Sequence, residues 1–266
     1  MKTKLLLLMV ILGVVLICAG SAMAYTVDGN LSDWGVDPSI PGAEDWTPNA
    51  GIYYSVEDTT SEWFLGPSGG GQLFDAEAMY LTWDDTNLYI ALVTGFPNSP
   101  TGVLENGKYY SAGDVAIDFG IDGSYEYGLE MGSHSPEYAY PNSWWAFNGA
   151  VGGVYDGITW KMSEDGTFPI NMHYTVPNPN LAGMASGFAY LNTYYNADPL
   201  YNHWVMETSI PRSIFGANWD PHLRVMWTET CGNDIATAAS PEPMSIALFG
   251  IGALGALFNI RRKSKR

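Results

Sequence analysis

From Asp114 to Met131, apolar and polar residues alternate on either side of the turn-forming pair Asp122-Gly123. In a β-strand successive side chains point to opposite faces, so Val115, Ile117 and Phe119 would share one face. Two alternating runs joined by a glycine-containing turn predict an antiparallel hairpin. This pattern restricts the chain to β-rich folds more strongly than any other part of the sequence.

Other short runs rich in β-branched and aromatic residues predict further strands. They lie within Ile52–Phe64 and at Ala78–Trp83, Leu88–Thr94, Trp144–Phe147, Ile158–Met162, Gly187–Tyr190, His203–Ile210 and Leu223–Thr230. The run from Leu88 to Val93 is continuously apolar, so we expect this strand to be covered on both faces. Between Tyr25 and Ala239 no helical periodicity exceeds one turn. The sequence therefore predicts an all-β antiparallel β-sandwich.

The first 24 residues have the pattern of a secretory signal peptide. Lys2 and Lys4 precede an apolar run, and Ala22-Met23-Ala24 forms a cleavage site of small residues. We expect this segment to be removed. Residues 25–235 would then form one exported sandwich domain, followed by a brief linker at 236–240.

The last 26 residues combine three ordered features: Pro241-Glu242-Pro243, an uncharged stretch and a basic end that begins with Arg261 and Arg262. The uncharged stretch, Met244–Ile260, is close to the length of a bilayer-spanning helix. The basic residues would stay on the cytoplasmic side. A plain tail anchor is one interpretation. The three features in this order also closely resemble the PEP-CTERM sorting signal, residues 241–266. That resemblance implies processing by an exosortase in the bacterial inner membrane, followed by residence at the cell surface or in the extracellular matrix.

Charge excludes one class of partner. The exported region has 27 acidic and four basic residues, which leaves 23 net negative charges. Nucleic-acid binding depends on neutralising phosphates with Lys and Arg, so nucleic acid is excluded. Cations and neutral sugars remain possible partners. Cys231 is the one cysteine left after signal removal, so the domain has no internal disulfide.

Four stretches resemble the family 9 carbohydrate-binding modules and their DOMON-like relatives. They are DGNLSDW (28–34), AMYLTWDDTNLYIALVTG (78–95), GDVAIDFG (113–120) and METSIPRSIFG (206–216). The resemblance implies a jelly-roll-like sandwich, sugar binding and structural Ca²⁺.

Aromatic residues in a loop-rich segment independently suggest a sugar site. Residues 137–160 contain Tyr138, Tyr140, Trp144, Trp145, Phe147, Tyr155 and Trp160. Pyranose rings stack on such side chains in concave sites with a few polar groups. In a strand Trp144 and Trp145 would point to opposite faces. Tyr138, Tyr140, Trp144 and Trp145 are therefore candidate sugar contacts, and burial of both tryptophans in the core is the alternative.

Two acidic groups are candidate metal ligands. Asp118, Asp122 and Glu126 surround a turn at intervals of four, a spacing that differs from that of an EF-hand. Asp28 and Asp33 form the second candidate, and Ca²⁺ is the cofactor that either would take. The alternative is that these residues only flank turns.

Catalysis has little support. Glu207 and Glu229 lie on late strands, and pairs of carboxylates serve glycosidases. No nucleophile, HExxH or phosphate-binding motif is present, however. The sequence therefore predicts an exported, non-enzymatic protein that binds extracellular or cell-surface polysaccharide. The alternative is a structural, acidic, calcium-binding matrix protein without a specific glycan ligand, and a hydrolase ranks third.

Overall fold

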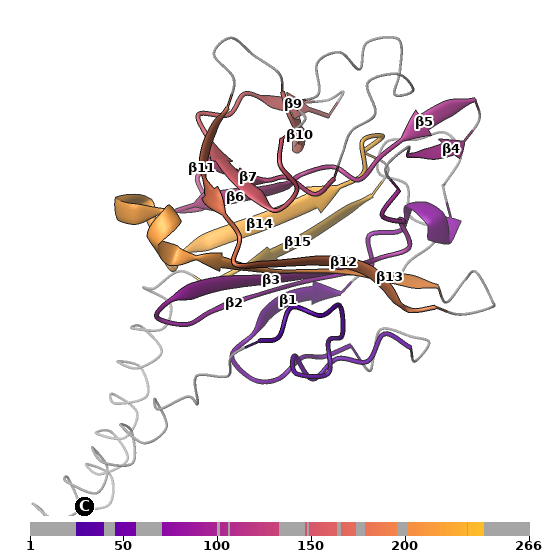
Figure 1. The fold of residues 1–266 in the computed structure, drawn as a ribbon, viewed down its shortest axis with the longest axis horizontal. Helices are drawn as coiled ribbons and strands as arrows, with labels where there is room; N and C mark the ends of the chain where they lie inside the picture. Colours follow the sequence, from indigo (N-terminus) through magenta and orange to yellow (C-terminus); the bar gives the residue numbers. More distant parts are fainter. Residues whose placement is uncertain are drawn as a thin grey trace, which may run out of the picture.

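A computed structural model describes residues 25–39, 46–56, 71–99, 102–105, 107–132, 147, 149–163, 166–173, 179–195, 202–232 and 234–241. These residues form two facing antiparallel sheets with smaller hairpins beside them (Figure 1). The prediction of an all-β sandwich is confirmed.

The first sheet has five strands in the order β1-β2-β3-β13-β12. They are β1 (Tyr53–Val56), β2 (Ala78–Trp83), β3 (Asn87–Thr94), β13 (His203–Pro211) and β12 (Gly187–Tyr194). The turn between β2 and β3 follows from its sequence, because Asp84 accepts hydrogen bonds from the N–H groups of Thr86 and Asn87.

The second sheet has six strands in the order β11-β8-β7-β6-β14-β15. They are β11 (Asn180–Met184), β8 (Gly153–Asp156), β7 (Tyr127–Leu129), β6 (Val115–Phe119), β14 (Leu223–Thr228) and β15 (Ile235–Ala239). The predicted hairpin is confirmed as the antiparallel pair β6–β7, in which Ile117 lies opposite Tyr127.

Among the described residues, the smaller elements are two hairpins and three short 3₁₀ helices. They are β4 (Val103–Glu105) with β5 (Lys108–Tyr110), β9 (Trp160–Met162) with β10 (Pro169–Met172), η2 (Gly71–Phe74), η5 (Arg212–Ile214) and η6 (Gly216–Asn218).

The core lies between the two sheets. Val115, Ile117 and Phe119 project into it from β6, as the alternation predicts. Leu92 and Met206 project into it from the opposite sheet. Both inner faces are therefore apolar, and this burial is the main force that stabilises the fold.

The N-terminal segment covers the outer face of the five-stranded sheet (Figure 1). Trp34 and Trp46 pack there against Tyr80 of β2 and Ala91 and Val93 of β3. The prediction that Leu88–Val93 is covered on both faces is thus confirmed.

Glu207 joins that segment to β13. Its Oε2 accepts hydrogen bonds from the N–H groups of Asp28 (3.1 Å) and Gly29 (2.6 Å). Its Oε1 accepts one from Trp34 Nε1 (2.8 Å). Glu207 is 1% exposed, so this carboxyl group is a buried acceptor for three donors from one turn.

The hairpin β9–β10 lies beside the outer face of the six-stranded sheet, where Phe168 and Ile170 pack against Met226 of β14. This cover explains why the outward-facing residues of β6, Ala116 and Asp118, are also buried. Asp114, just before the strand, accepts a hydrogen bond from Met172 N–H of β10 (2.9 Å).

The predicted linker at 236–240 is wrong, because Ile235–Ala239 forms β15 and Ser240 is buried. Ser240 N–H donates to Leu223 O (2.9 Å), and its hydroxyl donates to Pro221 O (2.6 Å). Small residues here pair with β14 instead of forming a flexible connection. The folded domain thus extends to within one residue of Pro241.

Burial raises the pKa of Glu207 from 4.5 to about 7, although the three N–H donors act in the opposite direction. The folded state therefore binds this proton more tightly than the unfolded state. The resulting stabilisation is present below pH 4.5 and is lost as the pH rises through 7, a change of roughly 3 kcal/mol. We expect Glu207→Gln to remove this component.

Urea unfolding at pH 5 and pH 8 would measure this effect. The wild type and the exposed-site control Glu105→Gln should lose the same stability between the two pH values, and Glu207→Gln should lose less. An equal loss in Glu207→Gln would contradict the assignment.

Candidate functional site

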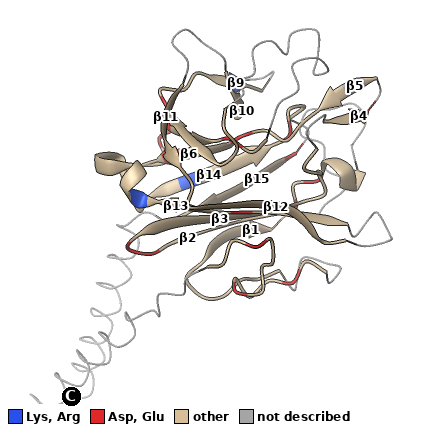
Figure 2. Cartoon of the chain, in the orientation of Figure 1, with Lys and Arg blue, Asp and Glu red and all other residues tan. Residues whose placement is uncertain are grey.

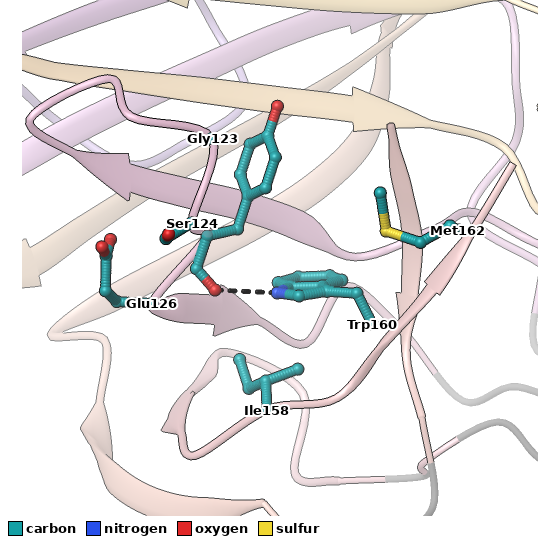
Figure 3. A pocket seen from close by; sticks show the side chains of 7 residues that line it. Gly123, Ser124, Glu126, Ile158, Trp160 and Met162 are labelled. Atoms are coloured by element: carbon teal, nitrogen blue, oxygen red, sulfur yellow. Dashed lines mark hydrogen bonds between the residues drawn. The ribbon is translucent and has the colours of Figure 1, made fainter. Parts of the chain in front are cut away.

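A surface hollow of about 360 Å³ lies between the β6–β7 connection and strand β9. It is lined by Gly123, Ser124, Tyr125, Glu126, Ile158, Trp160 and Met162. Figure 3 shows Ser124 and Glu126 on one side and Ile158, Trp160 and Met162 on the other. The hollow therefore has one polar wall and one apolar wall.

Asp118 shapes the polar wall by fixing the connection after β6. Its two carboxylate oxygens accept hydrogen bonds from the N–H groups of Asp122 and Gly123, both at 3.1 Å. Gly123 has a φ of 90° and Ile121 one of 53°, so the chain turns sharply here. Glu126 accepts a hydrogen bond from Phe119 N–H (2.9 Å), which brings the chain back toward β7.

Trp160 and Tyr125 form the aromatic part of the hollow. Trp160 Nε1 donates to Tyr125 O (2.8 Å), and the two ring centroids lie 6.3 Å apart at an interplanar angle of 69°. On β9, Trp160 and Met162 are half-buried and Lys161 between them is exposed, as alternation requires. Because the indole N–H is already used, the remaining surface of Trp160 offers mainly apolar contact.

An acidic cluster borders the same hollow. One oxygen from each of Asp118, Asp122 and Glu126 lies within 4.8 Å of the others. The predicted proximity of these three residues is confirmed, while their binding of Ca²⁺ stays a prediction. Burial raises the pKa of Glu126, and its hydrogen bond from Phe119 acts in the opposite direction.

Arg224 of β14 already supplies a positive charge to this cluster. Its Nη2 lies 2.6 Å from Asp118 Oδ2, and its Cζ lies 5.2 Å from the ring centroid of Tyr125. Ca²⁺ takes six to eight oxygen ligands. Asp118 is committed to Arg224 and the turn, so Asp122 and Glu126 are the carboxylates left for a metal ion. The residues present therefore fit a full calcium site poorly.

The second predicted metal pair has other roles. Asp28 Oδ1 accepts a hydrogen bond from Asn30 N–H (2.9 Å), and Asp33 Oδ2 accepts one from Thr26 N–H (2.7 Å). Within the described ranges, neither joins a group of three or more His, Cys, Asp or Glu side chains. Both carboxylates hold the N-terminal segment in shape.

Several predicted site residues lie outside the described residues. They are the sugar candidates Tyr138, Tyr140, Trp144 and Trp145 and the sorting residues Glu242, Pro243, Arg261 and Arg262. Pro241 is described and directly follows the buried Ser240. Among the described residues, no helix is long and apolar enough to cross a membrane.

Glu207 and Glu229 do not form a glycosidase pair. Glu207 lies on β13 of the five-stranded sheet, whereas Glu229 directly follows β14 of the six-stranded sheet. Both side chains are buried, so they do not flank a common open site.

The sequence indicated only part of this hollow. Trp160 belongs to the aromatic-rich segment, and Glu126 to the predicted metal group. Tyr125 and Met162 were not identified as site residues, because their convergence depends on where β9 packs. Alternation around Trp160 was the one available signal.

No protein-family model matches the chain, and no curated protein matches it either.

The ion pair between Arg224 and Asp118 can be tested together with Ca²⁺. Arg224→Met should lower stability by roughly 2 kcal/mol, because buried Asp118 loses its charged partner. Millimolar Ca²⁺ should then restore part of the melting temperature of this variant and affect the wild type less.

Arg212→Met is the matched control. Arg212 lies over the ring of Trp219, 4.1 Å from the centroid, and its Nη1 donates to Asp84 O. An equal calcium response in the wild type and Arg224→Met would show that the metal ion does not replace the guanidinium.

Proposed function

We propose that this chain is an exported, non-enzymatic β-sandwich protein that binds extracellular or cell-surface polysaccharide in the hollow lined by Tyr125 and Trp160. The observation that carries the proposal is the pairing of an aromatic wall with a polar wall in one open site. Sugar rings present apolar C–H faces and a rim of hydroxyl groups, so they need both kinds of surface.

The hollow has the features that such a ligand requires. Trp160 is held by its bond to Tyr125 O, so little ordering is needed when a ring packs against it. Ile158 and Met162 extend the apolar wall, while Glu126 and Ser124 offer acceptors for hydroxyl groups.

The route to the cell exterior rests on the sequence. The signal peptide at 1–24 and the PEP-CTERM-like tail at 241–266 support export, insertion in the inner membrane and processing by an exosortase. We extend the proposal to a jelly-roll-like topology, which the resemblance to family 9 carbohydrate-binding modules supports.

A second candidate function is a structural, calcium-binding matrix protein. The surplus of acidic residues favours it, and Asp122 and Glu126 offer two neighbouring carboxylates to a cation. Acidic residues are distributed over several strands and loops of the described chain, and few basic residues accompany them (Figure 2). This candidate predicts cation binding without selective retention on any glycan.

Replacing Trp160 separates these candidates. Trp160→Ala should weaken retention on the bound polysaccharide about tenfold, because an aromatic stacking surface contributes about 1.4 kcal/mol. Trp160→Phe keeps an aromatic face and should retain more binding than Trp160→Ala. A glycan array identifies the polysaccharide that the wild type binds. A pull-down on that insoluble polysaccharide then measures the retention of both variants.

Tyr195→Ala is the control, since Tyr195 is 74% exposed and does not line the hollow. It should bind like the wild type. If folded Trp160→Ala binds every retained glycan as tightly as the wild type, the hollow is not the site.

A further inference from the structure

Three carboxylates and one guanidinium give the hollow a local negative charge. Glu126 lines it, and the oxygens of Asp118 and Asp122 lie within 4.8 Å of the Glu126 oxygen. Arg224 pairs with Asp118 at 2.6 Å. One guanidinium beside three carboxylates leaves two net negative charges next to the aromatic wall.

No lysine or arginine lines the hollow among the described residues. Lys161 is exposed and alternates with Trp160 and Met162, so it projects from the opposite face of β9. Arg224 lies beside the ring of Tyr125 and is already paired with Asp118. An anionic sugar would therefore meet two carboxylates and gain no unpaired positive charge.

A cationic sugar would be attracted by the same carboxylates. Glu126 is only half-buried, and its Oε2 accepts the hydrogen bond from Phe119 N–H. An ammonium group about 4 Å from this carboxylate gains attraction in a medium intermediate between water and the protein interior. Asp122 is exposed beside it and adds attraction of the same sign.

We infer that the ligand class of this hollow is a glycan with free amino groups, in which one sugar ring packs on Trp160 and its ammonium group pairs with Glu126. This inference rests on the proposed function, because it specifies the ligand of the same site. It adds that charge, and not only ring shape, selects the ligand. Uronic acid polymers are then excluded, and N-acetylated polymers bind more weakly.

The test uses three oligosaccharides of equal length: glucosamine, N-acetylglucosamine and galacturonate oligomers. Binding to the exported region, residues 25–241, is measured by calorimetry at pH 6 and low salt with EDTA present. The wild type should bind the glucosamine oligomer about tenfold more tightly than the N-acetylated one. Salt at 0.5 M should reduce that ratio, because it screens the charge pair.

Glu126→Gln is the matched variant, since its carboxamide oxygen can still accept from Phe119 N–H. Glu126→Gln should bring the ratio of the affinities for the glucosamine and N-acetylglucosamine oligomers close to one. Glu105→Gln removes an exposed carboxylate on β4, and its ratio should equal that of the wild type. Melting temperatures recorded for each variant show whether the fold is retained.

The outcomes separate this inference from the proposed function. If N-acetylated and glucosamine oligomers bind alike and Trp160→Ala weakens both, the inference fails and the proposed function stands. Tighter binding of galacturonate also overturns the inference. If no glycan binds to the wild type, the proposed function fails and the inference fails with it. A tenfold ratio that Glu126→Gln removes supports both.

Discussion

The carboxyl group of Glu207 is the contact on which the layer outside the five-stranded sheet depends. Without its three hydrogen bonds, the turn at Asp28-Gly29 and the indole of Trp34 would lack a partner on β13. The segment they belong to then covers the outer side of β2 and β3 with apolar side chains. A buried charge-bearing group thus determines where a largely hydrophobic layer is placed.

This contact also joins two stretches that lie far apart in the sequence. Glu207 belongs to METSIPRSIFG, and its three donors belong to DGNLSDW. Arg212 of the first stretch donates to Asp84 O within AMYLTWDDTNLYIALVTG. These three stretches bind to one another and hold the fold. The hollow is built by other residues, so these stretches carry little information about the ligand.

Strands with strong local signals were predictable from sequence. The apolar run at Leu88–Val93 and the alternation at Asp114–Phe119 placed β3 and β6 within one residue. β15 was missed, because ATAA has small side chains and its pairing with β14 is set by the sheet edge. β8 and β11 carry glycines and lack clear alternation, so packing of distant residues determines them. For the same reason the sequence supplied Trp160 and Glu126 separately but not their convergence.

The buried hydroxyl of Ser240 has a consequence for the proposed membrane-attached form. Ala239 pairs with Arg224, which in turn pairs with Asp118, so the last described residues leave the sheet near the acidic end of the hollow. Three residues separate Ser240 from Met244, and three residues span about 10 Å when extended. Before any cleavage, the sandwich would have almost no freedom to swing away from the bilayer. In this proposed form the acidic end of the hollow would lie close to the lipid surface, and release of the tail would remove that constraint.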